Sequence, residues 1–241
     1  MIEPSLVSAL VVVRNGERFL ASALQSIQAQ TYRPIEILVV DGQSTDRTAE
    51  IARSFADVRY LRQPDLGVSN AYNFGLAHAQ GELIAFLSHD DLWTPDKLEV
   101  QVGHLLTHPD CQYTVCRIRL FLEPGYAPPA GFRLELLNQE PVAYIMETLV
   151  ARRELFARIG RLDPDLPTAE DVDWFARVFD AGVAGHVCDQ ALLRKRVHNR
   201  NTSLMDSDNN RQLLLALRHS IQRKHMARSG LVGRDLSMWL E

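Results

Sequence analysis

The sequence predicts an α/β protein with a mostly parallel sheet and helices on both of its faces. Unbroken apolar runs, such as residues 83–87, stop abruptly at polar residues, which is typical of buried parallel strands. Between these runs, apolar residues recur at helical spacing, as in Phe19, Leu20, Ala23 and Leu24. Strands that alternate with helices favour such a sheet.

The first 108 residues repeat this strand–helix unit four times. Thr94 and Pro95 open the last helix, because a capping residue followed by proline at the first helical position is a start signal. Ligands of such sheets bind beyond the carboxyl ends of the strands. The predicted strands cover residues 6–13, 35–40, 58–61 and 83–87, and the predicted helices cover residues 17–30, about 46–55, about 68–80 and about 94–106.

The regularity fades after residue 108. Residues 123–141 are rich in Pro and Gly and predict a long loop, either a functional segment such as a lid or a variable insertion. We expect one domain over residues 1–241, with a first half to about 108, a second half to about 205 and a helical tail. The other expected elements are a mixed or antiparallel strand at 113–122, a segment at 142–150 that leads into a helix at 153–159, a helix after Glu170-Asp171, two short strands at 186–188 and 192–197, and a helix from about 210 to 228.

The composition is that of a soluble globular protein, with 46% hydrophobic and 23% charged residues. The net charge of 26 − 30 = −4 predicts no nucleic-acid partner. Cys111, Cys116 and Cys188 lack metal-site spacing and are expected to be reduced in a cytosolic protein. Neither a signal peptide nor a membrane-spanning run of about 18 apolar residues is recognised.

Two adjacent carboxylates, Asp90 and Asp91, directly follow the apolar run at 83–87. Hard anionic oxygen ligands at a strand end suit a divalent cation that carries phosphates. The alternative is that both residues only cap the helix that starts at Thr94. This stretch by itself favours neither interpretation.

Several motifs follow one another along the chain: Asn15–Leu20, Ser26–Tyr32, Val39–Thr48, Asp65–Gly67, Ala71–Gly75, Gly81-Glu82, Asp90–Trp93, Glu170-Asp171 and His198. This ordered set, over about residues 5–205, resembles family 2 glycosyltransferases. The resemblance implies a GT-A fold, with a nucleotide-binding half to about residue 108 and an acceptor half to about residue 205. It also implies an inverting transferase that takes a sugar from a nucleoside-diphosphate donor.

The predicted donor site begins at the ends of the first two strands. Backbone groups near Val13 and Arg14 can frame a nucleotide base, and Asp41 can accept a hydrogen bond from a base N–H. The resemblance implies the same base contact for Asp41, whereas the alternative is a turn-forming residue. Asn70 and Asn73, on the following helical segment, are further candidates for donor contacts.

Asp90 is the predicted ligand of Mg²⁺ or Mn²⁺, which would stabilise the diphosphate leaving group, and Asp91 is expected to brace the turn. The resemblance implies that the imidazole of His198 reaches the diphosphate or the metal. It also implies an acidic residue where Ser88 stands; the Ser88 hydroxyl can still bond a ribose hydroxyl. His89 is counted with the donor-binding residues, although a structural role is favoured over ligation.

An inverting displacement needs a base for the acceptor hydroxyl. The acidic pair of the family implies Asp171 as this base, with Glu170 orienting the acceptor or sharing the role. The alternative is that both are first-turn acids favoured by the helix dipole.

The sequence therefore predicts transfer of a sugar from a nucleoside-diphosphate donor to a hydroxyl of a saccharide or lipid-linked saccharide. The alternatives are a catalytically impaired nucleotide-sugar-binding module and a sugar-phosphate nucleotidyltransferase. We expect a cytoplasmic protein, and peripheral contact with the inner face of the membrane and a homodimer remain open.

Overall fold

The first half of the chain forms four strand–helix units, as predicted. Parallel pairing joins β1 to β2 and β4, and β2 to β3, so these four strands end at one edge of the sheet. The strands are β1 (Val7–Val13), β2 (Ile35–Asp41), β3 (Val58–Arg62) and β4 (Leu83–Ser88), and the helices that follow them are α1 (Leu20–Gln28), α2 (Thr48–Ser54), α3 (Val68–His78) and α4 (Lys97–Thr107).

The computed structural model describes residues 4–123, 125, 127–129, 131–198 and 209–228. Arg200 and part of the expected tail, residues 206–208 and 229–241, lie outside these residues. The elements of the second part are β5 (Leu92–Trp93), β6 (Tyr113–Leu122), the 3-10 helices η1 (Leu134–Asn138) and η2 (Met146–Thr148), β7 (Val150–Arg152), α5 (Arg153–Ile159), α6 (Glu170–Asp180), β8 (Gly185–Val197) and α8 (Asn209–Arg228).

One expectation for the second half was wrong, and the sequence interpretation missed several short elements. The segment at 142–150 contains η2 and the start of β7, and β7 and β5 were not predicted. The two short strands expected after α6 are one strand, β8, whose register against β6 shifts around Arg117. The long loop carries η1. These elements do not produce the alternating apolar pattern of a strand, because their pairing is irregular or the strands are very short.

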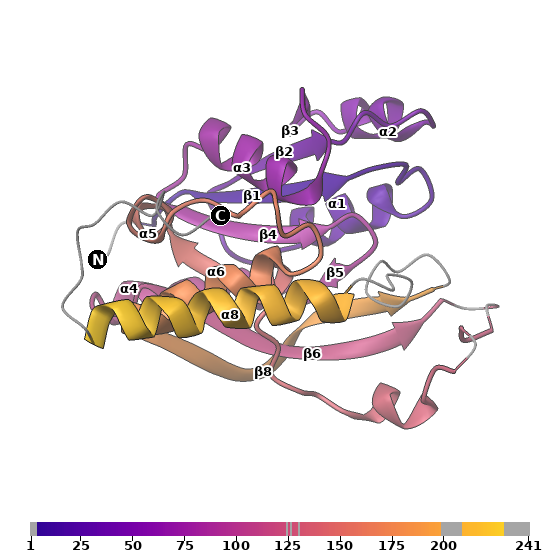
Figure 1. Ribbon diagram of the computed structural model, residues 1–241. Helices are drawn as coiled ribbons and strands as arrows, with labels where there is room; N and C mark the ends of the chain where they lie inside the picture. The colour runs from indigo at the N-terminus through magenta and orange to yellow at the C-terminus, as the bar shows by residue number, and fades with distance from the viewer. Residues whose placement is uncertain (1–3, 124, 126, 130, 199–208, 229–241) are drawn as a thin grey trace.

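Among the described residues, one eight-stranded sheet runs in the order β3-β2-β1-β4-β7-β6-β8-β5. It crosses both of the halves that the sequence suggests (Figure 1). β7 is antiparallel to β4 and to β6, and β6 is parallel to β8. The strand at 113–122 is therefore in a mixed environment, as predicted. The ends of β6 and β8 consequently lie on the same side as the ends of β1 and β4.

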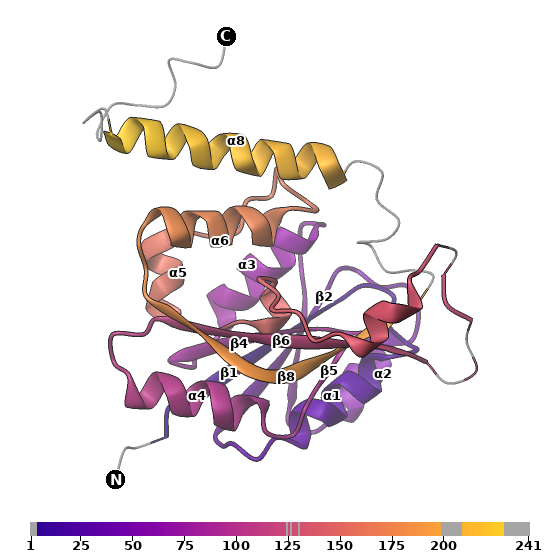
Figure 2. The ribbon, with the colours of Figure 1, turned by 90° about the horizontal axis from the view of Figure 1, so that it is seen from below.

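Helices cover both faces of the sheet (Figure 2). One core packs α1 and α4 against one face, with Leu20, Leu24 and Leu98 fully buried. The other core packs α3, α5 and α6 against the opposite face, around Phe86 and Trp174. This two-sided burial explains the unbroken apolar strands of the sequence.

The helix α8 lies on the outside of α6 (Figure 2). Ala216 packs against Leu166 and Ala169, and Arg223 forms ion pairs with Asp173 and Asp180. None of the helices among the described residues combines the length and the apolar composition that a membrane-spanning segment requires.

Candidate functional site

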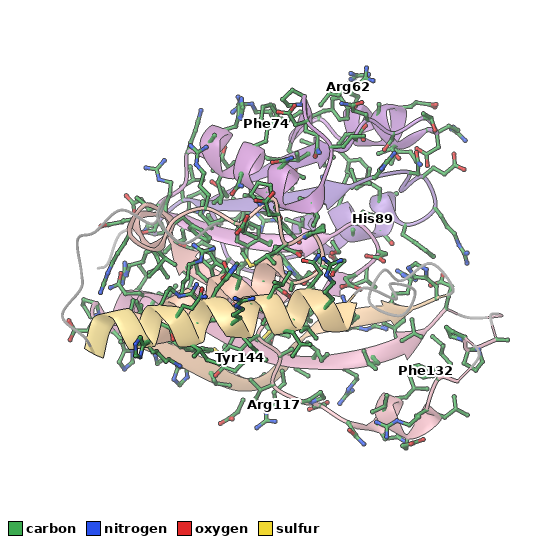
Figure 3. The ribbon with its side chains drawn as sticks, in the orientation of Figure 1. Arg62, Phe74, His89, Arg117, Phe132 and Tyr144 are labelled. Atoms are coloured by element: carbon green, nitrogen blue, oxygen red, sulfur yellow. The ribbon has the colours of Figure 1, made fainter. Side chains whose placement is uncertain are left out.

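The predicted site residues gather at the edge of the sheet where the parallel strands end. Asp41 closes β2, Ser88 closes β4, and His198 directly follows β8. Figure 3 shows His89 at this edge, just beyond the arrowhead of β4. The first turn of α6 supplies Glu170.

The structure brings Asp90 and His198 into direct contact, although 108 residues separate them in the chain. His198 Nε2 lies 2.9 Å from Asp90 Oδ2, and the two side chains are 12% and 14% exposed. Burial acts to raise the pKa of Asp90, but the hydrogen bond from His198 and the nearby positive charges outweigh it and lower the pKa to about 2. Asp90 is therefore ionised at any physiological pH.

The Asp90–His198 pair fits a divalent cation that is shared with phosphates. It offers one carboxylate and one imidazole, and no group of three or more His, Cys, Asp or Glu side chains suited to a metal occurs in the described part of the chain. Mg²⁺ and Mn²⁺ commonly take one or two protein ligands and complete their shell with phosphate oxygens and water. Phosphate oxygens and water would therefore have to complete the coordination shell of a cation at this pair.

Asp91 braces the turn after β4, as the sequence interpretation expects. Its carboxylate is fully buried, accepts a hydrogen bond from the Arg196 backbone N–H at 2.9 Å and pairs with Lys195 Nζ at 3.1 Å. Burial raises the pKa of Asp91 to about 7, although the charge of Lys195 acts to lower it. The acids around Lys195 raise the pKa of that lysine. The direct contact favours the ionised pair at neutral pH.

The neighbouring arginine also belongs to this brace. Arg196 is 4% exposed, its Nε donates to the carbonyl of Asp90 at 2.8 Å, and its guanidinium stacks 4.4 Å from the Phe19 ring centroid. Lys195 and Arg196 thus tie the end of β8 to the turn that carries Asp90, which positions His198.

Glu170 and Asp171 begin α6 in poorly solvated surroundings. Burial, followed by the charge of Asp171, raises the pKa of Glu170 to about 8. Burial, followed by the charge of Glu147, raises the pKa of Asp171 to about 6, and the Val172 backbone N–H bonds its Oδ1 at 2.7 Å. A helix dipole alone would lower these pKa values, so burial dominates here.

Glu147 is a site residue that the sequence interpretation missed. It lies in η2, is 9% exposed, and its Oε1 accepts a hydrogen bond of 2.5 Å from Ser88 Oγ. A carboxylate therefore stands beside Ser88, although the chain places it 59 residues later. The one available signal was an acid inside the otherwise mostly apolar segment 142–150.

At the ends of β1 and β2, Asp41 is engaged within the protein. Its Oδ1 accepts from the backbone N–H and the hydroxyl of Ser44 at 2.8 and 2.6 Å, and its Oδ2 accepts from Tyr60 OH at 2.6 Å. These contacts are those of the turn-forming alternative. The Gly42 N–H bonds the Val13 carbonyl at 2.8 Å, and Arg14 is exposed beside it. Base contact by Asp41, Val13 and Arg14 stays a prediction.

The asparagines of α3 make contacts within the protein. The side-chain amide of Asn73 exchanges two hydrogen bonds with the backbone of Leu162, at 2.8 and 3.0 Å, and Asn70 Nδ2 donates to the carbonyl of Leu66 at 2.8 Å. Asn73 thus ties α3 to the segment before α6. Donor contacts of both residues stay predictions.

His89 lies against the tight turn after β1. A Cβ added to Gly16 would come within 2.7 Å of the His89 ring and 2.4 Å of Val13 Cγ2, so only glycine fits there. Burial lowers the pKa of His89, which favours the neutral imidazole. This packing agrees with the structural role favoured for His89.

Two hollows lie away from this edge. One, of about 490 Å³, is bordered by His104, His108 and His186, and the other, of about 500 Å³, by Arg158 and Arg223 among others. Neither contains a residue of the predicted site.

Solved structures define the class of fold. The chain superposes on TarS 1-349 of S. aureus in complex with UDP-GlcNAc with a TM-score of 0.71 and 18% identity, over 90% of this chain and 66% of that chain. The mannosyltransferase PcManGT of Pyrobaculum calidifontis, in complex with GDP-Man and Mn2+, gives a TM-score of 0.66 and 19% identity, over 97% and 77% of the two chains. At these identities the likeness shows the fold, which is GT-A.

Sequence comparison then gives the family. The sequence model of Glycosyl transferase family 2 matches residues 8–160, more than half of the chain. An uncharacterized glycosyltransferase of Rickettsia typhi is 32% identical over 212 residues, which are 82% of this chain and 66% of that protein. One of Rickettsia conorii is 30% identical over 223 residues, 86% of this chain but 37% of its own length. The chain belongs to glycosyltransferase family 2, and its resemblance to that family is confirmed.

Proposed function

We propose that the chain transfers a sugar, with inversion, from a nucleoside-diphosphate donor to a hydroxyl of a saccharide or lipid-linked saccharide. The observation that carries the proposal is that two carboxylates at the same sheet edge have opposite surroundings. Asp90, against His198, has a pKa of about 2, whereas Asp171 has a pKa of about 6. Pairs of acids whose pKa values are pushed apart are typical of acid–base sites.

The proposed roles follow from these environments. Asp171 accepts the proton of the acceptor hydroxyl while that oxygen attacks C1 of the donor sugar, and the bond from C1 to the diphosphate oxygen breaks. The nucleoside diphosphate leaves with the bonding electrons. Asp90 and His198 would hold Mg²⁺ or Mn²⁺, which when bound offsets the charge of the diphosphate. Glu170, with its high pKa, orients the acceptor as a hydrogen-bond donor.

The donor half is assigned by its position. Val13, Arg14 and Asp41 line the ends of β1 and β2, beside the β4 end that carries Ser88. The base and ribose would lie along these ends, since ligands of open α/β sheets bind beyond the carboxyl ends of the strands. Relatives of the same fold hold UDP-GlcNAc in one case and GDP-Man with Mn2+ in another, which supports this class of donor and cofactor.

A donor panel tests the proposal. We expect release of nucleoside diphosphate from at least one UDP-, GDP- or TDP-sugar in the presence of Mn²⁺, and a product with the opposite anomeric configuration by NMR. Binding of a nucleotide without turnover of any donor, with saccharide acceptors present, would favour the impaired binding module. Release of pyrophosphate from a nucleoside triphosphate would favour the nucleotidyltransferase. A cytoplasmic location, peripheral membrane contact and a homodimer stay predictions.

A further inference from the structure

Glu147 reaches the site because β7 runs antiparallel to β4. Val150 at the start of β7 pairs with Ala85, so the residues just before β7 lie beside the end of β4. The hydrogen bond from Ser88 Oγ to Glu147 Oε1 closes this contact, and the glutamate is 9% exposed. A buried carboxylate is thereby placed beside Ser88, which precedes Asp90 by two residues.

A buried polar network fixes the backbone that carries Glu147. The carbonyl of Thr148 accepts hydrogen bonds from Gln101 Nε2 at 2.9 Å and from Lys97 Nζ at 3.3 Å. The Thr148 hydroxyl donates to the carbonyl of Ala143 at 2.7 Å. Lys97, Gln101 and Thr148 are fully buried. Supporting contacts of this kind hold a functional side chain in one place.

The charge of Glu147 is felt on the base side of the site. It contributes to the raised pKa of Asp171, of Glu170 and of the buried Tyr72 on α3, in each case alongside burial. It is also the first of the charges that raise the pKa of Lys195. Glu147 therefore contacts the end of β4 and lies within electrostatic reach of the start of α6.

The donor sugar has to occupy this same region under the proposed function. Its C1 is bonded to the diphosphate, which lies at Asp90 and His198. The acceptor oxygen that attacks C1 gives its proton to Asp171. The sugar ring thus lies between the Asp90–His198 pair and Asp171, beside the carboxylate of Glu147.

We propose that Glu147 is a specificity-determining residue that selects a neutral donor sugar: its carboxylate accepts hydrogen bonds from the sugar hydroxyls and repels a uronate. The inference rests on the proposed function and names the substrate class of that site. An ionised carboxylate is an acceptor only, and its hydrogen bonds with hydroxyls are stronger than neutral ones. A second carboxylate on the sugar, brought beside it in a poorly solvated site, is disfavoured by like-charge repulsion, which is how sites discriminate by rejection.

Calorimetric binding with matched ligands tests this assignment. UDP-glucose and UDP-glucuronate form one pair, GDP-mannose and GDP-mannuronate a second, with UDP and GDP alone as ligands that lack the sugar, all with Mn²⁺. For the nucleotide that binds, we expect the wild-type protein to prefer the neutral sugar at least tenfold. Glu147→Gln should weaken the neutral donor three- to tenfold, tighten the uronate and reduce the preference to threefold or less. Affinity for the nucleotide alone should change less than twofold.

Controls separate this role from a structural one. Ser88→Ala, which removes the hydroxyl that holds the carboxylate, should lower the preference in the same direction by a smaller factor. Glu135→Gln, an exposed glutamate of the other 3-10 helix, should leave every affinity unchanged. An unchanged preference in Glu147→Gln, or an equal loss of affinity for the nucleotide alone, overturns the inference and leaves the proposed function standing. A wild-type protein that binds neither of these nucleotides nor any TDP-sugar of the donor panel overturns both.

Discussion

The carboxylate at the end of β4 and those at the start of α6 lie at one sheet edge but in opposite surroundings. Asp90 receives a hydrogen bond from His198 and is surrounded by positive charge, so its pKa falls to about 2. Glu170 and Asp171 are buried near other acids, and their pKa values rise to about 8 and about 6. A group that holds a cation needs a permanent charge, whereas a group that accepts a proton needs an affinity for protons. Under the proposed function, Asp90 meets the first need and Asp171 meets the second.

The largest effect is expected from the base side. Asp171→Asn keeps the shape of the side chain but cannot accept the acceptor proton, so the transfer rate should fall about 10³-fold, within the range of general-base removal. Donor binding by calorimetry should change less than twofold. Asp165→Asn, exposed in the preceding loop, is the matched control. Retention of more than a tenth of the wild-type rate would contradict the base assignment.

The same aspartate-to-asparagine substitution at Asp90, the proposed cation ligand, should have a different effect. Asp90→Asn removes the charged oxygen ligand, so the transfer rate should fall about 100-fold and the Mn²⁺ concentration for half-maximal rate should rise at least tenfold. A titration of the rate with Mn²⁺ measures both. His198→Gln should shift the same midpoint by a smaller factor. An unaltered Mn²⁺ midpoint in both variants would remove these residues from the cation site.

The pH dependence should report the base side. Asp171 acts as a base only when it is deprotonated, and Glu170 donates a hydrogen bond only while it is protonated. The value of kcat/KM should therefore rise about tenfold per pH unit below pH 6, level off, and fall again above pH 8. Asp90 is already ionised across this range and should add no step. A pH series of initial rates between 4.5 and 8.5 measures the profile. A midpoint near 4, the ordinary value of an aspartate, would mean that burial does not perturb Asp171.

The smallest effect concerns stability. Because the folded-state pKa of Glu170 is raised from 4.5 to about 8, its folded form holds the proton more tightly, and wild-type stability declines as pH rises between these values. Glu170→Gln removes this titration and should be stabilised relative to wild type by about 1 kcal/mol at pH 8.5, or roughly 3 °C in Tm. The difference should vanish near pH 4.5 in thermal unfolding. A variant that is less stable at pH 8.5 would show that Glu170 is ionised and favourably bonded.

The first half could be predicted from the sequence because its signals are local. β1, β2 and β4 are mostly apolar runs with mostly buried residues, whereas β3 at the sheet edge is short and only half-buried. The helices between them show apolar residues at helical spacing. The joining of Asp90 to His198 followed from the family resemblance rather than from spacing, since 108 residues separate them. The order of the motifs predicted this long-range proximity, which no local pattern indicates.

Prediction failed for elements and residues whose placement depends on partners far away in the chain. β5 and β7 are two and three residues long, and their conformation comes from pairing with β8 and β4. Glu147 carries no motif, and it reaches the site only through the antiparallel placement of β7. Lys195 and Arg196, near the end of β8, are engaged in bracing the Asp90–Asp91 turn, which no local sequence pattern indicates.

The tie between the end of β8 and the Asp90–Asp91 turn bears on the order in which the chain is synthesised. The four parallel strands leave the ribosome within the first ninety or so residues, but Lys195, Arg196 and His198 emerge about a hundred residues later. Until then, Asp91 lacks the partners that offset its burial. Under the proposed function, the first half of the fold is therefore made early, and a donor would meet a competent site only after the second half has been made.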